Sequence, residues 1–185
     1  MSQDSSLYVR IKTKKENLER FLGASLQQAE IDEDWMTWWD SREMHSKSTL
    51  DKIPAFEFAT NRDVLEYHKN NQQLEGMESW DEETGIWSFS ILFFSQNYYA
   101  IMPVLAWLKS LASFLEPGDE GNAIIYDFFW GGNSVMADLV FQHQQATLKT
   151  TRHTSNVDKK ALKAANDALE QAHDILSEKY KDIDY

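Results

Sequence analysis

The sequence predicts a single α+β domain: a mainly antiparallel sheet of about five strands, with helices packed on one face and a long C-terminal helix added. Three observations predict it. Apolar and polar residues alternate through 7–12, and a longer apolar run fills 86–94, as in strands. Apolar residues recur at three-and-four spacing through 98–115 and again through 157–181, as in amphipathic helices. The order of these segments is loosely ferredoxin-like.

The domain organisation follows from length and from shifts in composition. A chain of 185 residues fits one domain. We expect an α+β core at 1–142, a polar linker at 143–156 and a C-terminal helix at 157–181, packed on the core or on a partner. Within the core, residues 56–60 are expected to form a short strand and residues 70–84 a polar surface loop.

The clearest local prediction is a hairpin of strands 122–130 and 134–142. Gly131, Gly132 and Asn133 between them suit a tight two-residue turn, which requires positive φ angles. That turn places one apolar face inward. The expected inward residues are Ile124, Tyr126, Phe128, Trp130, Val135, Ala137, Leu139 and Phe141. The opposite face then carries Asp127 and Asp138 as neighbours.

Charge and composition restrict the function. The formal net charge is -12, from 30 acidic and 18 basic side chains. This argues against direct nucleic-acid binding, which Lys and Arg drive, and favours a basic protein partner. The absence of cysteine excludes disulfides, thiolate zinc sites and a cysteine nucleophile. No secretory signal or membrane-length apolar run is recognisable, so we expect a cytoplasmic protein without membrane contact.

No residue set in the sequence spells out a reaction. Serine-nucleophile and phosphate-loop motifs are missing, and the five histidines are scattered. Asp127 and Asp138 are the one expected carboxylate pair. Their face could meet solvent, be covered by Arg10 or Arg62, receive a partner's cation, or serve as an acid–base pair or metal site. No metal-ligand spacing supplies a third ligand, so we expect no catalytic residue, metal or cofactor.

Two segments combine acidic residues with tryptophan. The first, 30–44, is expected either to be an amphipathic helix that closes the core or to be a recognition surface. The second, 75–83, has the same chemistry in a loop. Acids around tryptophan would steer a basic partner and anchor it. The expected partner-binding residues are Asp34, Trp35, Trp38, Trp39, Asp40, Glu78, Trp80, Asp81, Glu82, Glu83, Asp127 and Asp138.

Three stretches carry a resemblance to a known class of protein. They are Glu-Asp-Trp-Met-Thr-Trp-Trp-Asp at 33–40, Trp-Asp-Glu-Glu-Thr-Gly-Ile-Trp at 80–87 and Tyr-Asp-Phe-Phe-Trp-Gly-Gly-Asn at 126–133. With them, the chain resembles the immunity proteins of bacterial toxin–immunity systems, including contact-dependent growth inhibition. The resemblance implies a cytoplasmic, non-enzymatic inhibitor. Such a protein binds one cognate toxin, often a nuclease with a basic active site, and occludes that site.

Other functions stay open from the sequence. A DNA mimic, or another inhibitor of a nucleic-acid-binding protein, would need carboxylates spaced like phosphates, whereas the acids here cluster in loops. A small metal-dependent hydrolase would use Asp127 and Asp138. A self-assembling protein would use the Leu/Ala seam of the last helix. Whether the chain is a monomer or a dimer is left open.

Overall fold

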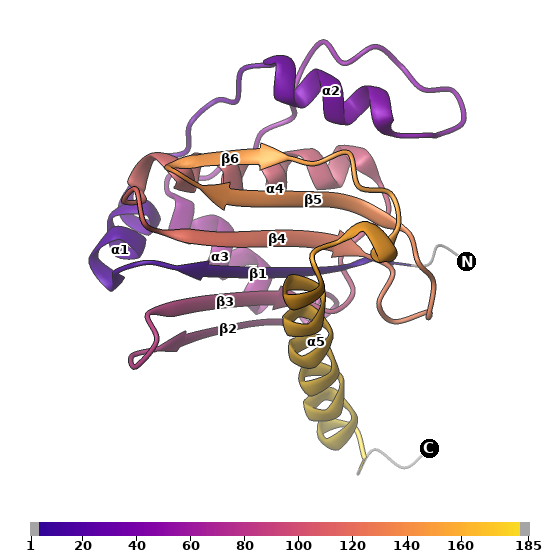
Figure 1. Cartoon of the computed structure of the whole chain (residues 1–185). Helices are drawn as coiled ribbons and strands as arrows, with labels where there is room; N and C mark the ends of the chain where they lie inside the picture. The colour runs from indigo at the N-terminus through magenta and orange to yellow at the C-terminus, as the bar shows by residue number, and fades with distance from the viewer. Residues whose placement is uncertain (1–3, 182–185) are drawn as a thin grey trace.

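The computed structural model describes residues 4–181 and has one six-stranded antiparallel sheet with helices on both faces (Figure 1). The strands are β1 (Ser6–Lys12), β2 (Gly76–Asp81), β3 (Ile86–Ile91), β4 (Glu120–Tyr126), β5 (Val135–Gln142) and β6 (Gln145–Leu148). The helices are α1 (Lys15–Gly23), α2 (Glu33–Ser41), α3 (Asn61–Asn70), α4 (Tyr98–Ser110) and α5 (Lys159–Lys179), with short 3-10 turns η1 (Leu111–Phe114) and η2 (Thr154–Asn156). The predicted α+β class is confirmed.

The strand order is β2-β3-β1-β4-β5-β6. With α1 to α3 before β2 and α4 before β4, the first four strands follow the β-α-β-β-α-β connectivity of ferredoxin-like folds. β5, β6 and α5 extend that unit. No helix among residues 4–181 is both long and apolar enough to cross a membrane.

The alternation in β1 divides the interior into two layers. Leu7, Val9 and Ile11 are fully buried toward the layer of α1 to α4, which holds the main core. Tyr8 and Arg10 point to the opposite face, where α5 crosses the sheet (Figure 1). The sequence predicts helices on one face of the sheet only, and this part of the prediction is wrong. α5 packs on the opposite face and forms a second, smaller core there.

The seam of α5 packs on its own sheet. Ala165, Leu169 and Ala172 are buried, and the first two form a cluster with Tyr8 and Ile124. Small side chains let the helix lie close to the strands. The sequence leaves open whether this helix packs on the core of its own chain or on a partner, and the structure shows it on its own core.

The β4–β5 hairpin differs from its predicted register. Ile125 pairs with Ala137 and Ile124 with Asp138, and the register shifts between Ile125 and Tyr126. The connection runs from 127 to 134 rather than through a two-residue turn. Because one residue of slip exchanges the faces of a strand, Ile124 and Tyr126 lie under α5, while Ala137 points to the other layer.

Three other segments differ from expectation. Residues 76–81, expected as loop, form β2. This strand lies at the edge of the sheet and is mostly exposed, so its sequence lacks the apolar alternation that predicts a strand. Residues 56–60 form no strand, although Phe56 and Phe58 pack against the core. Within the expected linker 143–156, the chain forms β6 and η2, so that segment belongs to the domain.

Candidate functional site

The three tryptophans of α2 belong to the core and not to a contact surface. Trp35, Trp38 and Trp39 are at most 2% exposed. The indole N–H of Trp38 donates to the Met136 carbonyl, and that of Trp39 donates to the Ser48 carbonyl. The expectation that they anchor a partner is therefore wrong, and the alternative, a helix that closes the core, is observed.

The acids of α2 have different environments. Asp34 forms an ion pair with Lys109, and its carboxylate also accepts the Leu148 N–H of the sheet-edge strand β6. It therefore ties α2 to α4 and β6. Asp40 is exposed, and it remains a predicted contact residue.

The acidic segment of the β2–β3 hairpin is mainly engaged within the chain. Glu78 accepts the Trp87 indole N–H at 2.8 Å and pairs with a lysine of α3. Asp81 accepts the backbone N–H groups of the hairpin turn, and Glu82 pairs with Lys15 across an exposed 3.0 Å contact. Trp80 packs partly buried against the core. The exposed Glu83 is least constrained, and the contact role predicted for this segment stays a prediction.

Asp127 and Asp138 do not form a pair. The N–H of Asp127 donates to the Ser134 carbonyl, in the loop after β4, whereas Asp138 lies within β5 opposite Ile124. Ser134 and Asp138 are 4 residues apart in sequence, roughly 13 Å along an extended strand. The two carboxylates line different cavities, so the two-carboxylate chemistry proposed from sequence has no shared site.

The loop that replaces the expected tight turn carries three consecutive aromatic residues at the surface. We call residues 127–134 the aromatic loop. Phe128 and Phe129 are half-buried, and Trp130 is 51% exposed. Phe129 lies edge-on to Phe93 and Trp130, both at 5.1 Å between ring centroids, and 5.5 Å from the His173 ring of α5. The exposed Trp130 is therefore held in place by Phe129, which itself packs against Phe93 and His173; we call these three rings the fixed aromatic base.

Asp127 shapes the loop from within. Its Oδ1 accepts the Trp130 backbone N–H at 3.2 Å, and its Oδ2 lies where a side chain on Gly132 would begin, 1.9 Å from the ideal Cβ position. Gly131 adopts a φ of +71°, which favours glycine. The Gly-Gly pair that suggested a two-residue turn instead permits a wider loop closed by an aspartate.

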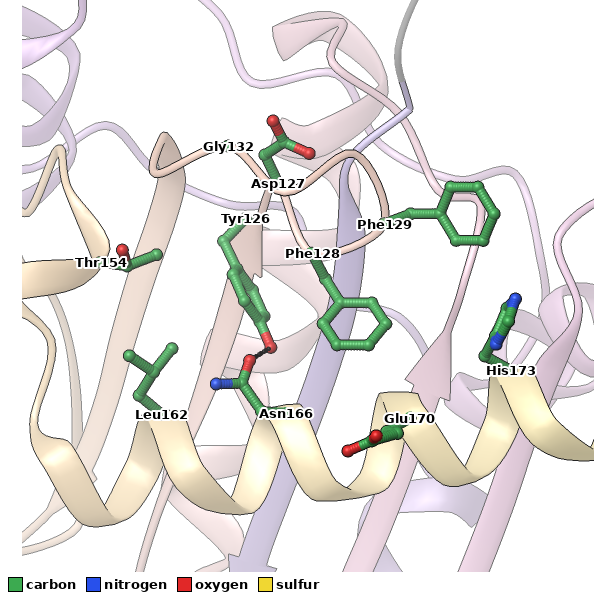
Figure 2. A pocket seen from close by; sticks show the side chains of 10 residues that line it. All are labelled: Tyr126, Asp127, Phe128, Phe129, Gly132, Thr154, Leu162, Asn166, Glu170 and His173. Carbon is green, nitrogen blue, oxygen red and sulfur yellow. Dashed lines mark hydrogen bonds between the residues drawn. The ribbon is translucent and has the colours of Figure 1, made fainter.

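A cavity of about 610 Å³ separates the aromatic loop from α5 (Figure 2). Tyr126 and Phe128 reach from the strand side toward the helix, and Asn166, Glu170 and His173 come from α5. The Tyr126 hydroxyl donates to Asn166 Oδ1 at 2.6 Å. Burial raises the pKa of Tyr126 well above its usual range, so this hydroxyl stays a proton donor.

The cavity combines aromatic rings with negative charge. Glu170 is exposed at its rim, whereas the half-buried Asp127 points its carboxylate away from α5 and into the loop (Figure 2). No lysine or arginine is among the lining residues. Aromatic faces and carboxylates together attract Lys and Arg side chains. Among the described residues, no group of three or more His, Asp or Glu side chains could hold a metal ion.

The sequence indicated only part of this site. The sequence predicts Asp127 as a contact residue, and the stretch 126–133 carries the resemblance, but the predicted hairpin places Phe128 and Trp130 on an inward strand face. The sequence does not identify Asn166, Glu170 and His173 as site residues. They line the cavity only because α5 packs opposite the aromatic loop, and the pattern of the helix does not show where it packs. The available clue was the aromatic run directly before two glycines, with an aspartate able to close a turn.

Searches of protein-family models, of curated proteins and of solved structures find no match to this chain. The features of this chain that bear on its function are the aromatic loop, the adjoining face of α5 and the net charge.

Proposed function

We propose that this chain is a non-enzymatic binding protein that recognises a basic protein partner through the aromatic loop and the adjoining face of α5. One observation carries the proposal: Trp130 is half-exposed on a fixed aromatic base beside a carboxylate-lined cavity. A rigid, exposed tryptophan supplies contact area at low entropy cost, and tryptophan is enriched at the energetic centres of interfaces.

The charge pattern supports the chemistry of the partner. The chain carries a net charge of -12, and Glu170 lines the same cavity as Phe128 and Phe129 of the aromatic loop. A lysine or arginine of the partner would enter between the Phe128 ring and the Glu170 carboxylate, where cation–π and ionic attraction add. The surrounding negative field would raise the association rate at low salt.

The finer proposal is that the partner is a bacterial toxin domain, and that binding occludes its active site. The resemblance of 126–133 to immunity-protein sequences motivates it, and the same residues form the aromatic loop. The separation of Asp127 from Asp138 gives the alternative, a hydrolase built on that pair, no support from geometry. The acids that lie in ion pairs, such as Glu82 and Asp34, also disfavour a continuous phosphate-like row.

The test is capture of a partner from the native host, with Trp130→Ala as the variant and Tyr99→Ala as its control. Tyr99 is 59% exposed, slightly more than Trp130, but lies at the start of α4. We expect the wild type and Tyr99→Ala to retain one basic protein, and Trp130→Ala to bind it at least about 30-fold more weakly, a loss of about 2 kcal/mol. Both variants should unfold at the wild-type urea concentration.

Growth assays then test neutralisation. The captured protein should arrest growth when expressed alone and not when co-expressed with this chain, and Trp130→Ala should lose that protection. A captured partner that is harmless would contradict the toxin proposal while leaving the binding surface in place. Equal retention by wild type and Trp130→Ala would contradict the binding surface itself.

A further inference from the structure

A second cavity, on the other side of α5, is lined by three basic side chains that form no ion pair among the described residues, although three carboxylates line it as well. It measures about 800 Å³ and lies between the first turns of α5, the strands β4 and β5, and the segment that follows β6. Its basic lining residues are Arg10, Lys149 and Lys160. Among residues 4–181, none of these three forms an ion pair, whereas many other lysines and arginines of this acidic chain do.

Arg10 is the central feature of this groove. It lies on β1 in the middle of the sheet, directly opposite Asn122 of β4, which in turn pairs with Val140 of β5. Its side chain is half-buried on the α5 face. A partly buried guanidinium that forms no ion pair is unfavourable, because the cost of desolvation is not offset by direct pairing. An anion bound in the groove would remove that cost.

The surroundings of Arg10 suit a polar ligand. Asn122 offers an amide beside it on the floor, and Lys149 and Lys160 approach from two separate walls. The cavity volume lies in the usual range for small-molecule sites. The 21-residue helix α5 also begins here, and its N-terminus adds partial positive charge.

Three acidic residues also line the groove, and two of them are already engaged. Asp158 caps α5 by accepting the Ala161 N–H at 3.0 Å, and Asp138 accepts the Thr151 hydroxyl at 2.7 Å. Burial raises the pKa of Asp138, so it gives up its charge more readily than a surface carboxylate when an anion binds nearby. The third, Glu120, is the first residue of β4 and is exposed to solvent.

We propose that this groove binds the phosphate group, or an equivalent dianionic oxoanion, of a small molecule. Arg10 supplies the forked, charge-assisted hydrogen bonds that suit such a group, and Lys149 and Lys160 add point charges. This site is independent of the aromatic loop, since the two cavities share no lining residue.

The experiment is a titration of the full chain with inorganic phosphate and with ribose 5-phosphate, followed by amide NMR at constant ionic strength, with chloride as the reference salt. We expect saturable shifts at residues that line the groove, and tighter binding of the sugar phosphate. Arg10→Gln should weaken binding at least about tenfold, and Lys160→Gln by about threefold, because each removes a charged contact.

Lys163→Gln is the matched control. It makes the same change on the same helix, but Lys163 pairs with Asp167 in solvent and does not line the groove. Its affinity should equal that of the wild type. Lys160 is exposed, so Lys160→Gln tests the site even if Arg10→Gln disturbs the sheet. Shifts that fail to saturate, that chloride reproduces, or that survive both substitutions would overturn the proposal.

Discussion

Arg42 shows how one residue can join distant segments without an ion pair. It is 3% exposed, and its guanidinium donates to four backbone carbonyls at 2.8 to 3.1 Å. Those carbonyls belong to Val135 and Met136 at the start of β5, and to Thr150 and Thr151 after β6. The end of α2 is thereby joined to β5 and to the segment after β6, about a hundred residues further along the chain.

Replacing Arg42 should therefore destabilise the fold strongly. We expect Arg42→Met to lower the free energy of unfolding by about 3–5 kcal/mol, because four buried or part-buried carbonyls each lose a charged donor. Arg42→Lys should recover only part, since an ammonium cannot reproduce the fork. Urea unfolding measures both. Arg20→Met is the control, because Arg20 is exposed and donates a 3.4 Å hydrogen bond to the Phe114 carbonyl. If Arg42→Met lowered the free energy of unfolding by no more than this control, the structural role of Arg42 would be contradicted.

His68 should make stability depend on pH. It is 4% exposed among aromatic rings, and its Nδ1 lies 2.7 Å from the Val64 carbonyl. Burial lowers the pKa of His68 below its ordinary 6.5. The unfolded chain therefore binds the proton more readily, so the contribution of neutral His68 is intact above pH 6.5 and is lost as the pH falls toward its folded pKa.

The measurement is urea unfolding of wild type and His68→Phe between pH 7.5 and 5. The advantage of the wild type over the variant should shrink as the pH falls, by no more than about 1.4 kcal/mol per pH unit. Subtracting the variant removes the titration of the carboxylates. A difference that stays constant across this range would contradict a buried, neutral His68.

At the scale of elements, the β5–β6 hairpin has a turn that its sequence does not reveal. His143 and Gln144 connect the two strands with φ angles of +53° and +61°. Both fall in the left-handed region that a two-residue type I′ turn demands and that Asn and Gly occupy most easily. The turn therefore carries strain, offset in part by the Gln144 side chain, which donates to the Leu115 carbonyl.

We expect His143→Asn to raise the free energy of unfolding by about 0.5–1 kcal/mol, because Asn adopts the left-handed conformation more easily and the Gln144 contact remains. His153→Asn makes the same change at an extended residue, where φ is -131°, and should have no such effect. Thermal unfolding of the two variants decides the matter. Equal shifts would mean that the turn conformation is not the cause.

Sequence patterns succeeded where one periodic face meets one core. They identified β1, β3 and α4 and the long seam of α5, because burial there follows a single period. They failed at the β4–β5 register, where a bulge and an aspartate-closed loop changed the faces. The alternation of apolar and polar residues does not show where a bulge occurs. A pair of glycines is compatible both with a tight turn and with a wider loop in which a carboxylate occupies the space beside the glycine.

At the scale of the whole molecule, the sheet has two unequal faces. One carries α1 to α4 over the main core, and the other is crossed by α5 alone (Figure 1). A single helix cannot cover six strands, so open cavities lie on both sides of it. Both proposed sites are cavities of this face. No sequence pattern could have located them, because each depends on where α5 lies over the sheet.

The central position of β1 also has a consequence for how the chain folds. β1 pairs with β3 and β4, yet these strands end at residues 91 and 126. During synthesis, β1 emerges before both of the strands with which it pairs, so its apolar face stays unpaired until they are made. Contacts between such distant segments are slow to form, because chain entropy must be lost before they are gained. Folding should therefore be slow for a chain of this size.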